Sequence, residues 1–284
     1  TCNPRERVAL FTPAFPSYWA AAAHLGLEVV PVPLPEHDGF HLSRAAIDLA
    51  LAARPRAIIV NNANNPTGAV YSAATLRELV ARCEKAGIWL LSDETYADLC
   101  FDHAFSTLAS PQTGHVVVMS SFSKVLSVPG FRTGYAVAHE SVITKIALSN
   151  STLYSCLPAF TQRGCLAGLS VLDRYAETVR AHGSRLIDSC HHRINKSGLL
   201  YCSHPQSGFY LFVDIAGTGL DDMTFCRRLL EEHHTAVTPG RCFGQDYASF
   251  IRLATCGDDE DVREGVSRTI AFAQKLGGCR VQAA

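Results

Sequence analysis

Two short segments of the 284-residue chain gather side chains that could do chemistry, and each directly follows an apolar run. Residues 61–68 read Asn-Asn-Ala-Asn-Asn-Pro-Thr-Gly, and residues 92–96 place Asp93 three positions before Tyr96. A carboxylate at a strand end can keep a proton on a ring nitrogen of a ligand, and a phenol one turn later can reach the same ring. Taken alone, residues 61–68 also fit an ordinary turn, and Asp93 also fits a helix N-cap.

A third segment, residues 121–134, places Ser121 and Ser123 beside Lys124, with Arg132 eight positions after the lysine. Hydroxyl and guanidinium groups among small and rigid residues could form an anion cradle, and the lysine amine could act as a nucleophile. A solvated surface lysine is the alternative interpretation of Lys124.

The elements that must position these segments follow a βα rhythm over the first 138 residues. Predicted helices at 18–25, 44–53 and 73–86 have Ser43 and Ser72 at N-cap positions, and Gly87 where a left-handed C-terminal residue belongs. Between them, short and nearly continuous apolar runs predict strands at 8–11, 28–32, 57–60, 88–92, 116–120 and 135–138. This pattern predicts an α/β fold with a mostly parallel sheet, helices on both faces and ligands at the carboxyl ends of the strands.

After Ala138 the pattern becomes helical and then returns to short strands. We expect helices at 141–149, 159–172, 173–195, 222–232 and 260–276, and strands at 209–214, 236–238 and 250–253. The sequence therefore predicts a large domain over residues 1–174 and a smaller C-terminal α+β domain over residues 175–284.

Composition excludes several classes of protein. The chain carries 25 basic and 26 acidic residues, so no basic field is available to hold a nucleic acid. Its apolar runs are too short for a membrane helix. Eleven cysteines, an odd number without any Cys-x-x-Cys pair, argue against disulfides and metal binding and favour reduced thiols in the cytoplasm.

The polar segments match a known family in order and spacing. Asn-Asn-Pro-Thr-Gly at 64–68, Asp-x-x-Tyr at 93–96, Ser-Phe-Ser-Lys at 121–124 and Gly-Phe-Arg-x-Gly at 130–134 resemble the pyridoxal-phosphate enzymes of aminotransferase class I/II, the fold type I group. The resemblance implies pyridoxal 5'-phosphate as cofactor, an amino acid and a 2-oxo acid as substrates, and a homodimer. Compared with that family the chain begins late, and we expect a large domain that lacks its usual N-terminal part.

The resemblance also implies a role for each residue at the cofactor ring. Lys124 would form the internal aldimine with the cofactor aldehyde and act as the base at the substrate Cα. Asp93 would pair with the pyridinium nitrogen, which makes the ring an electron sink. Asn65 and Tyr96 match the positions that hydrogen-bond the 3-oxygen, and Phe15 matches an aromatic residue that stacks on the ring.

Two further sites follow from the same resemblance. Ser121, Ser123 and Arg132 match the phosphate anchor, in which a guanidinium can grip two oxygens. Arg252, in the apolar run 250–254, matches the arginine that binds the substrate α-carboxylate; without the other motifs a structural ion pair is the alternative.

The resulting expectation is amine transfer through a Lys124 aldimine. Two alternatives stay open at this point. Residues 128–132, Val-Pro-Gly-Phe-Arg, are similar to a segment of aminocyclopropane-carboxylate synthase, so a pyridoxal-phosphate lyase or cyclase is one alternative. The other is a truncated and catalytically inactive module of the same fold.

Overall fold

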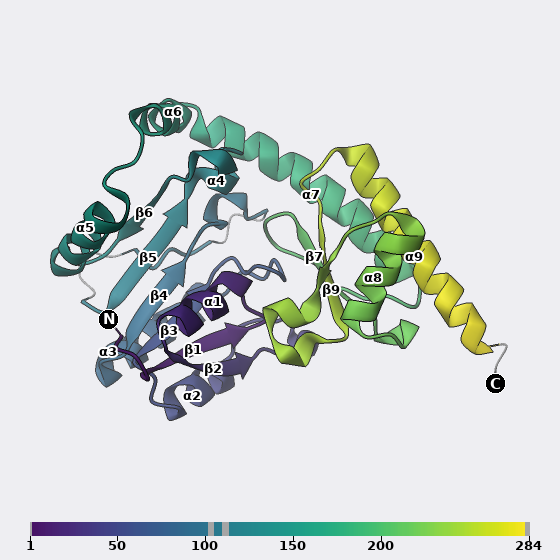
Figure 1. Cartoon of the computed structure of the whole chain (residues 1–284), viewed down its shortest axis with the longest axis horizontal. Coiled ribbons are helices and arrows are strands. Elements are labelled where there is room, and N and C mark those ends of the chain that lie inside the picture. The colour runs from purple at the N-terminus through teal and green to yellow at the C-terminus, as the bar shows by residue number, and fades with distance from the viewer. Residues whose placement is uncertain (1, 102–104, 110–113, 282–284) are drawn as a thin grey trace.

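The computed structural model describes residues 2–101, 105–109 and 114–281, with side chains described as far as residue 277. Thr1 and residues 282–284, which the predicted domain ranges include, lie outside the described residues. A six-stranded sheet has the order β2-β1-β3-β4-β5-β6, parallel except for the β5–β6 pair (Figure 1). Its strands are β1 (Arg7–Thr12), β2 (Glu28–Pro33), β3 (Ala57–Asn61), β4 (Trp89–Asp93), β5 (Val116–Ser121) and β6 (Gly134–Val137). The predicted mostly parallel sheet is confirmed.

Alternating side chains of the strands bury both faces of this sheet. Ala9 and Phe11 of β1 belong to a buried cluster with side chains of α2 and α3, whereas Val8 and Leu10 pack with α1 on the opposite face. The α-helices over the described residues are α1 (Pro16–His24), α2 (Arg44–Ala52), α3 (Ala73–Ala86), α4 (Phe122–Val125), α5 (Glu140–Tyr154), α6 (Ala159–Leu169), α7 (Leu172–Lys196), α8 (Asp222–His233) and α9 (Asp259–Val281).

The three predicted helix caps agree with the structure. Ser43 Oγ accepts a hydrogen bond from the Ala46 amide at 3.2 Å, and Ser72 Oγ accepts one from the Thr75 amide at 3.1 Å. Both serines therefore satisfy an amide that has no partner within the helix. Gly87 ends α3 with a φ of 65°, the left-handed conformation expected of a C-terminal glycine.

A second, antiparallel sheet has the order β7-β9-β8 and consists of β7 (Tyr210–Asp214), β9 (Phe250–Ala254) and β8 (Thr238–Pro239). Side chains of β7 and β9 form a buried apolar cluster with side chains of α7, α8 and α9. The long helix α7 contacts α4, which follows a strand of the large sheet, and α9, which packs with the small sheet (Figure 1). It therefore links the two parts of the structure. The predicted boundary between residues 174 and 175 falls in the first turn of α7 and stays a prediction.

The ten cysteines of the described side chains are free thiols, and six of them are buried. Within the same part of the chain, no three His, Cys, Asp or Glu side chains gather in an arrangement that could hold a metal ion. None of the helices described there is both long and apolar enough to cross a membrane.

Candidate active site

The carboxyl ends of β3, β4 and β5 bring the three polar segments to one edge of the large sheet. Asn61, the last residue of β3, lies in register with Asp93, the last residue of β4. Lys124 lies in the short helix α4, which begins directly after β5. Parallel strands end on the same side, so residues far apart in the sequence meet at this edge.

Asp93 is held by a tyrosine from α1. The Tyr18 hydroxyl donates a hydrogen bond of 2.5 Å to Asp93 Oδ2, and the Thr95 amide donates one of 3.0 Å to Oδ1. Burial raises the pKa of the Tyr18 phenol well above its ordinary value, and the neighbouring charge of Asp93 raises it further. The phenol therefore stays a neutral donor that holds the Asp93 carboxyl group in place.

The adjacent acid, Glu94, has a different role. Its side chain is buried and accepts hydrogen bonds from Ser92 Oγ at 3.0 Å, Thr107 Oγ1 at 2.6 Å and the Leu108 amide at 2.8 Å. With its oxygens occupied by protein donors, Glu94 ties residues 107–108 to β4 and leaves Asp93 as the acid at the site.

The segment 61–68 is an ordered loop whose side chains bond its own backbone. Asn61 Oδ1 accepts from the Asn65 amide at 2.8 Å, and Asn64 Oδ1 accepts from Thr67 Oγ1 at 2.7 Å. Gly68 has a φ of 72°, and a Cβ there would lie 2.6 Å from Pro205 Cβ. The segment is therefore the turn that the residues predict, and it also fixes the backbone that carries Asn65.

Asn65 and Tyr96 meet Arg252, a residue of the small sheet. Arg252 Nη1 donates to Asn65 Oδ1 at 3.0 Å, and Asn65 Nδ2 lies 3.5 Å from the Tyr96 hydroxyl. Arg252 has no ion-pair partner among the described residues, and its buried Nε has no hydrogen-bond acceptor there. The alternative of a structural ion pair for Arg252 is therefore not what the structure shows.

Tyr210 of β7, which the sequence analysis did not single out, lies between these groups. The Tyr96 hydroxyl donates to the Tyr210 hydroxyl at 3.2 Å, and Arg252 Cζ lies 4.2 Å from the centroid of the Tyr210 ring. Burial, followed by the neighbouring Tyr210, raises the pKa of Tyr96 well above that of an exposed phenol. Tyr96 is therefore a neutral hydrogen-bond donor at this site.

The Lys124 amine has no hydrogen-bond or ion-pair partner among the described residues. Its nitrogen lies 5.8 Å from the centroid of the Phe209 ring, and that ring lies 5.6 Å from the ring of Tyr96. The side chain is partly buried. Lys124 is thus an available amine near Phe209, whereas a solvated surface lysine would be fully exposed.

The predicted phosphate anchor is partly assembled. Ser121 Oγ donates to Ser123 Oγ at 2.8 Å and accepts from the Ser123 amide at 3.1 Å. Arg132 is exposed and donates to the Pro129 carbonyl oxygen at 2.8 Å. The structure brings the two serines together, and the described contacts of the Arg132 side chain do not include them.

Phe15 lies beside the residue that holds Asp93. Its ring packs edge-on against the Tyr18 ring, with 5.7 Å between the centroids. Sequence reasoning placed Tyr18 at the start of an apolar helix and gave it no role. A tyrosine hydroxyl in the first turn of a helix that packs on a sheet is the one signal that could have identified it.

The sequence profile described as aminotransferase class I and II matches residues 1–268. The chain belongs to this family. It is 30% identical over 279 residues to the putative aminotransferase YugH of Bacillus subtilis, covering 96% of this chain and 71% of that protein. It is also 30% identical over 273 residues to an aspartate aminotransferase of Thermotoga maritima, covering 95% and 70%.

Solved structures of aminotransferases have the same fold. The aromatic aminotransferase of Pyrococcus horikoshii superposes with a TM-score of 0.90 at 28% identity, over 97% of this chain and 75% of that one. The chain is thus a pyridoxal-phosphate-dependent enzyme that transfers amino groups. These relatives are aminotransferases, so transamination is favoured over the lyase or cyclase and over the inactive module.

The residues of this aminotransferase fit its cofactor by chemical type. A ring with a cationic nitrogen needs an acidic partner, and Asp93 is held in place for that role by Tyr18. A phenolate-like ring oxygen needs a donor, and Tyr96 is a neutral phenol. An aldehyde needs an available amine, which Lys124 provides, and the unpartnered Nε of Arg252 marks a guanidinium with donor capacity for a ligand.

Proposed function

We propose that this aminotransferase moves an amino group from an amino acid to a 2-oxo acid with Lys124, Asp93 and Tyr96 as catalytic residues. The observation that carries the proposal is the contact of Arg252 with Asn65, which lies against Tyr96 in turn. This contact joins a group that can bind a carboxylate to groups that can bind a cofactor ring.

Pyridoxal phosphate, when bound, supplies an aldehyde that takes up amines and a ring that accepts electron density. Asp93 would pair with the ring nitrogen, and Tyr18 holds the Asp93 carboxyl group in place through its 2.5 Å hydrogen bond. With the cofactor bound, Asn65 Nδ2 and the Tyr96 hydroxyl would donate to the ring oxygen, and Tyr96 would turn its hydroxyl hydrogen away from Tyr210 to do so. Phe15 packs on the ring face, and its contact with Tyr18 holds it near Asp93.

Lys124 would hold the cofactor through its amine, and the same amine would act as the base that moves the proton at the substrate Cα. Its lack of a competing partner among the described residues supports both roles. Arg252 binds the substrate α-carboxylate with two parallel hydrogen bonds, which orients the Cα–H bond for proton removal. Ser121, Ser123 and Arg132 bind the phosphate.

The decisive experiment compares Lys124→Ala with Lys85→Ala. Lys85 is an exposed lysine in the last turn of α3, so its substitution removes the same charge away from the site. We expect wild type and Lys85→Ala to bind pyridoxal phosphate with a visible absorbance that changes on addition of an amino donor. Lys124→Ala should lose this change and the amine transfer. Equal transfer by both variants would refute the role of Lys124.

The donor and acceptor are proposed only as a class. A relative from Pseudomonas aeruginosa is named arginine–pyruvate transaminase, and others are named aspartate aminotransferases. All of these substrates carry an α-carboxylate, the group for which Arg252 is suited. A spectral titration with each amino acid identifies the donor, and an Arg252→Gln variant should weaken binding of every donor found.

A homodimer is the proposed assembly. Large apolar side chains of α5 and α6 are exposed, among them Leu153 at 71%, Tyr154 at 77%, Phe160 at 71% and Leu166 at 68%. Apolar surface gathered over consecutive elements is typical of protein interfaces. Light scattering after size exclusion should show a dimer that Leu153→Glu with Phe160→Glu dissociates. Leu230→Glu, at an exposed side chain of α8, is the control and should leave the dimer intact.

The cytoplasm is the proposed location. Free thiols at the ten described cysteines, three of which are exposed, support a reducing compartment. Fractionation of cells that produce the protein tests this, and recovery with secreted proteins would contradict it.

A further inference from the structure

The guanidinium of Arg252 is supported by one short segment of the small sheet. Arg252 Nη2 donates to Thr238 Oγ1 at 3.3 Å, and Arg252 Cζ lies 5.0 Å from the centroid of the Phe243 ring. Thr238 and Phe243 are the two ends of residues 238–243, which comprise β8 and a 3₁₀ turn at Gly240–Phe243. We call these residues the support segment. Any movement of the support segment would change the surroundings of the guanidinium.

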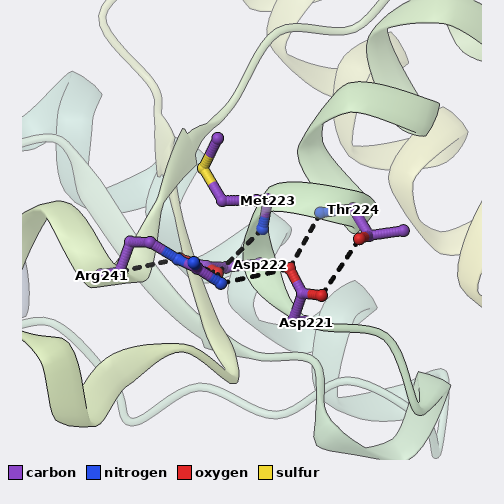
Figure 2. Close-up of polar contacts among 5 residues, drawn as sticks. All are labelled: Asp221, Asp222, Met223, Thr224 and Arg241. Carbon is purple, nitrogen blue, oxygen red and sulfur yellow. Dashed lines mark hydrogen bonds and ion pairs between the residues drawn. The ribbon is translucent and has the colours of Figure 1, made fainter.

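The middle of the support segment is fixed by an ion pair between Arg241, which is partly exposed, and the buried Asp222 (Figure 2). Asp222, at the start of α8, is fully buried, with an exposed fraction of 0%. Its Oδ1 accepts from Arg241 Nε at 2.6 Å, and its Oδ2 accepts from the Arg241 backbone amide at 2.8 Å. One carboxylate therefore holds both the side chain and the main chain of Arg241.

A second carboxylate completes the attachment. Asp221 Oδ1 lies 3.2 Å from Arg241 Nη2 and also accepts the Thr224 amide at 3.0 Å as the N-cap of α8 (Figure 2). Asp222 Oδ1 accepts the Met223 amide at 2.8 Å. Arg241 is thus joined to two acids that are themselves fixed by the first turn of α8.

The support segment also has little freedom on its other side. A Cβ on Gly240 would lie 2.2 Å from the Tyr247 carbonyl oxygen, so the backbone there is in close contact. The Phe243 carbonyl oxygen accepts from the Ala14 amide at 2.8 Å, which joins the segment to the residue before Phe15. Removing Arg241 would leave Asp222 as a buried charge without its ionic partner, and the segment would have to shift to hydrate it.

We propose that Arg241 and Asp222 are positioning residues for the substrate carboxylate, because their ion pair fixes the support segment and thereby the guanidinium of Arg252. This inference rests on the proposed function of Arg252. Arg241 and Asp222 do not contact Arg252 in the structure, so they act through Thr238 and Phe243. Both substrates carry an α-carboxylate, and loss of the pair should weaken both to a similar degree.

The test compares Arg241→Gln with Arg82→Gln in the holoenzyme. Arg82 is a matched control: it also pairs with two carboxylates and has a side chain 30% exposed, against 37% for Arg241. We expect Arg241→Gln to raise KM for the amino donor and for the 2-oxo acid on the order of tenfold, since small misplacements of binding groups are costly. The kcat and the affinity for pyridoxal phosphate should stay within about twofold of wild type.

Two further variants keep the test sharp if Arg241→Gln folds poorly. Thr238→Val removes only the hydrogen bond to Arg252 and should raise both KM values in the same way, by a smaller factor. Arg241→Lys retains one cation but cannot bond both acids as the guanidinium does, so it should give KM values between wild type and Arg241→Gln.

The inference is overturned if an active wild type and Arg241→Gln have the same KM values. It is equally overturned if KM rises while kcat, cofactor affinity and thermal stability all fall together, because that pattern indicates general destabilisation of the fold. Failure of the proposed function is a separate result, since it would appear as amine transfer that persists in Lys124→Ala or as donor binding that is unchanged in Arg252→Gln.

Discussion

Glu36 provides a quantitative test of the electrostatics of this fold. It lies in the short turn Glu36–Asp38 after β2, is half-buried, and has an Oε1 atom that is buried without a partner among the described residues. Burial, followed by the nearby charge of Asp214, raises the pKa of Glu36 from 4.5 to about 7. We predict that Glu36→Gln stabilises the protein in a pH-dependent manner.

The direction of this pH dependence follows from proton binding. Between pH 4.5 and about 7 the unfolded chain releases the Glu36 proton while the folded chain keeps it. The contribution of Glu36 to the free energy of unfolding is therefore fully present below pH 4.5, where the side chain is neutral in both states. It is lost as the pH rises through about 7, because the folded protein must then hold a partly buried charge. The difference between the folded and unfolded pKa values of Glu36 corresponds to about 3 kcal/mol of unfolding free energy, or ~1.5 kcal/mol once solvent screening of a half-buried group is included.

The assay is thermal unfolding of wild type and Glu36→Gln at a fixed scan rate. At about pH 5 the two midpoints should nearly coincide, and at about pH 8 the variant should unfold about 3 °C higher. Glu28→Gln, at an exposed position at the start of β2, is the control and should show no such trend. A Glu36→Gln advantage that is constant with pH, or larger in acid, would refute the reasoning.

Two more predictions concern the site. Tyr18→Phe removes the 2.5 Å hydrogen bond to Asp93 and should lower kcat about tenfold, since hydrogen bonds to charged groups contribute ~1.5–3 kcal/mol; a kcat equal to that of wild type would contradict the role of the phenol. Gly240→Ala places a Cβ 2.2 Å from the Tyr247 carbonyl oxygen and should lower the free energy of unfolding by ~2–3 kcal/mol. Gly257→Ala, whose Cβ would lie 3.7 Å from Val262 Cγ2, should change this free energy by less than about 0.5 kcal/mol, with both variants measured by urea titration.

Strands, helices and their ends were largely readable from local patterns. The predicted strand at 57–60 is β3, one residue longer at its end, and the predicted helix at 73–86 is α3 with the same bounds. The predicted strand at 236–238 was misplaced, because β8 spans only Thr238–Pro239. That strand is too short for a periodic pattern, and its pairing with β9 defines it.

The relations among the site residues were much less accessible. Asn65 and Tyr96 were predicted as separate ring donors, whereas in the structure they also form the surroundings of Arg252 and Tyr210. Tyr18 was missed because its partner lies 75 positions away. Hydrogen-bond partners at such separations depend on which strands become neighbours, and no local pattern encodes that.

The order of turn residues, acid, phenol and lysine after apolar runs was enough to indicate the α/β architecture, the family and the residue types of its chemistry, because each of these signals is local. Tertiary structure alone decided that Arg252 reaches Asn65 across 187 positions, that Tyr18 holds Asp93, and that Arg241 is fixed by the buried Asp222. These contacts arise when two sheets and their helices pack, since burial then determines which polar groups must find partners in one another.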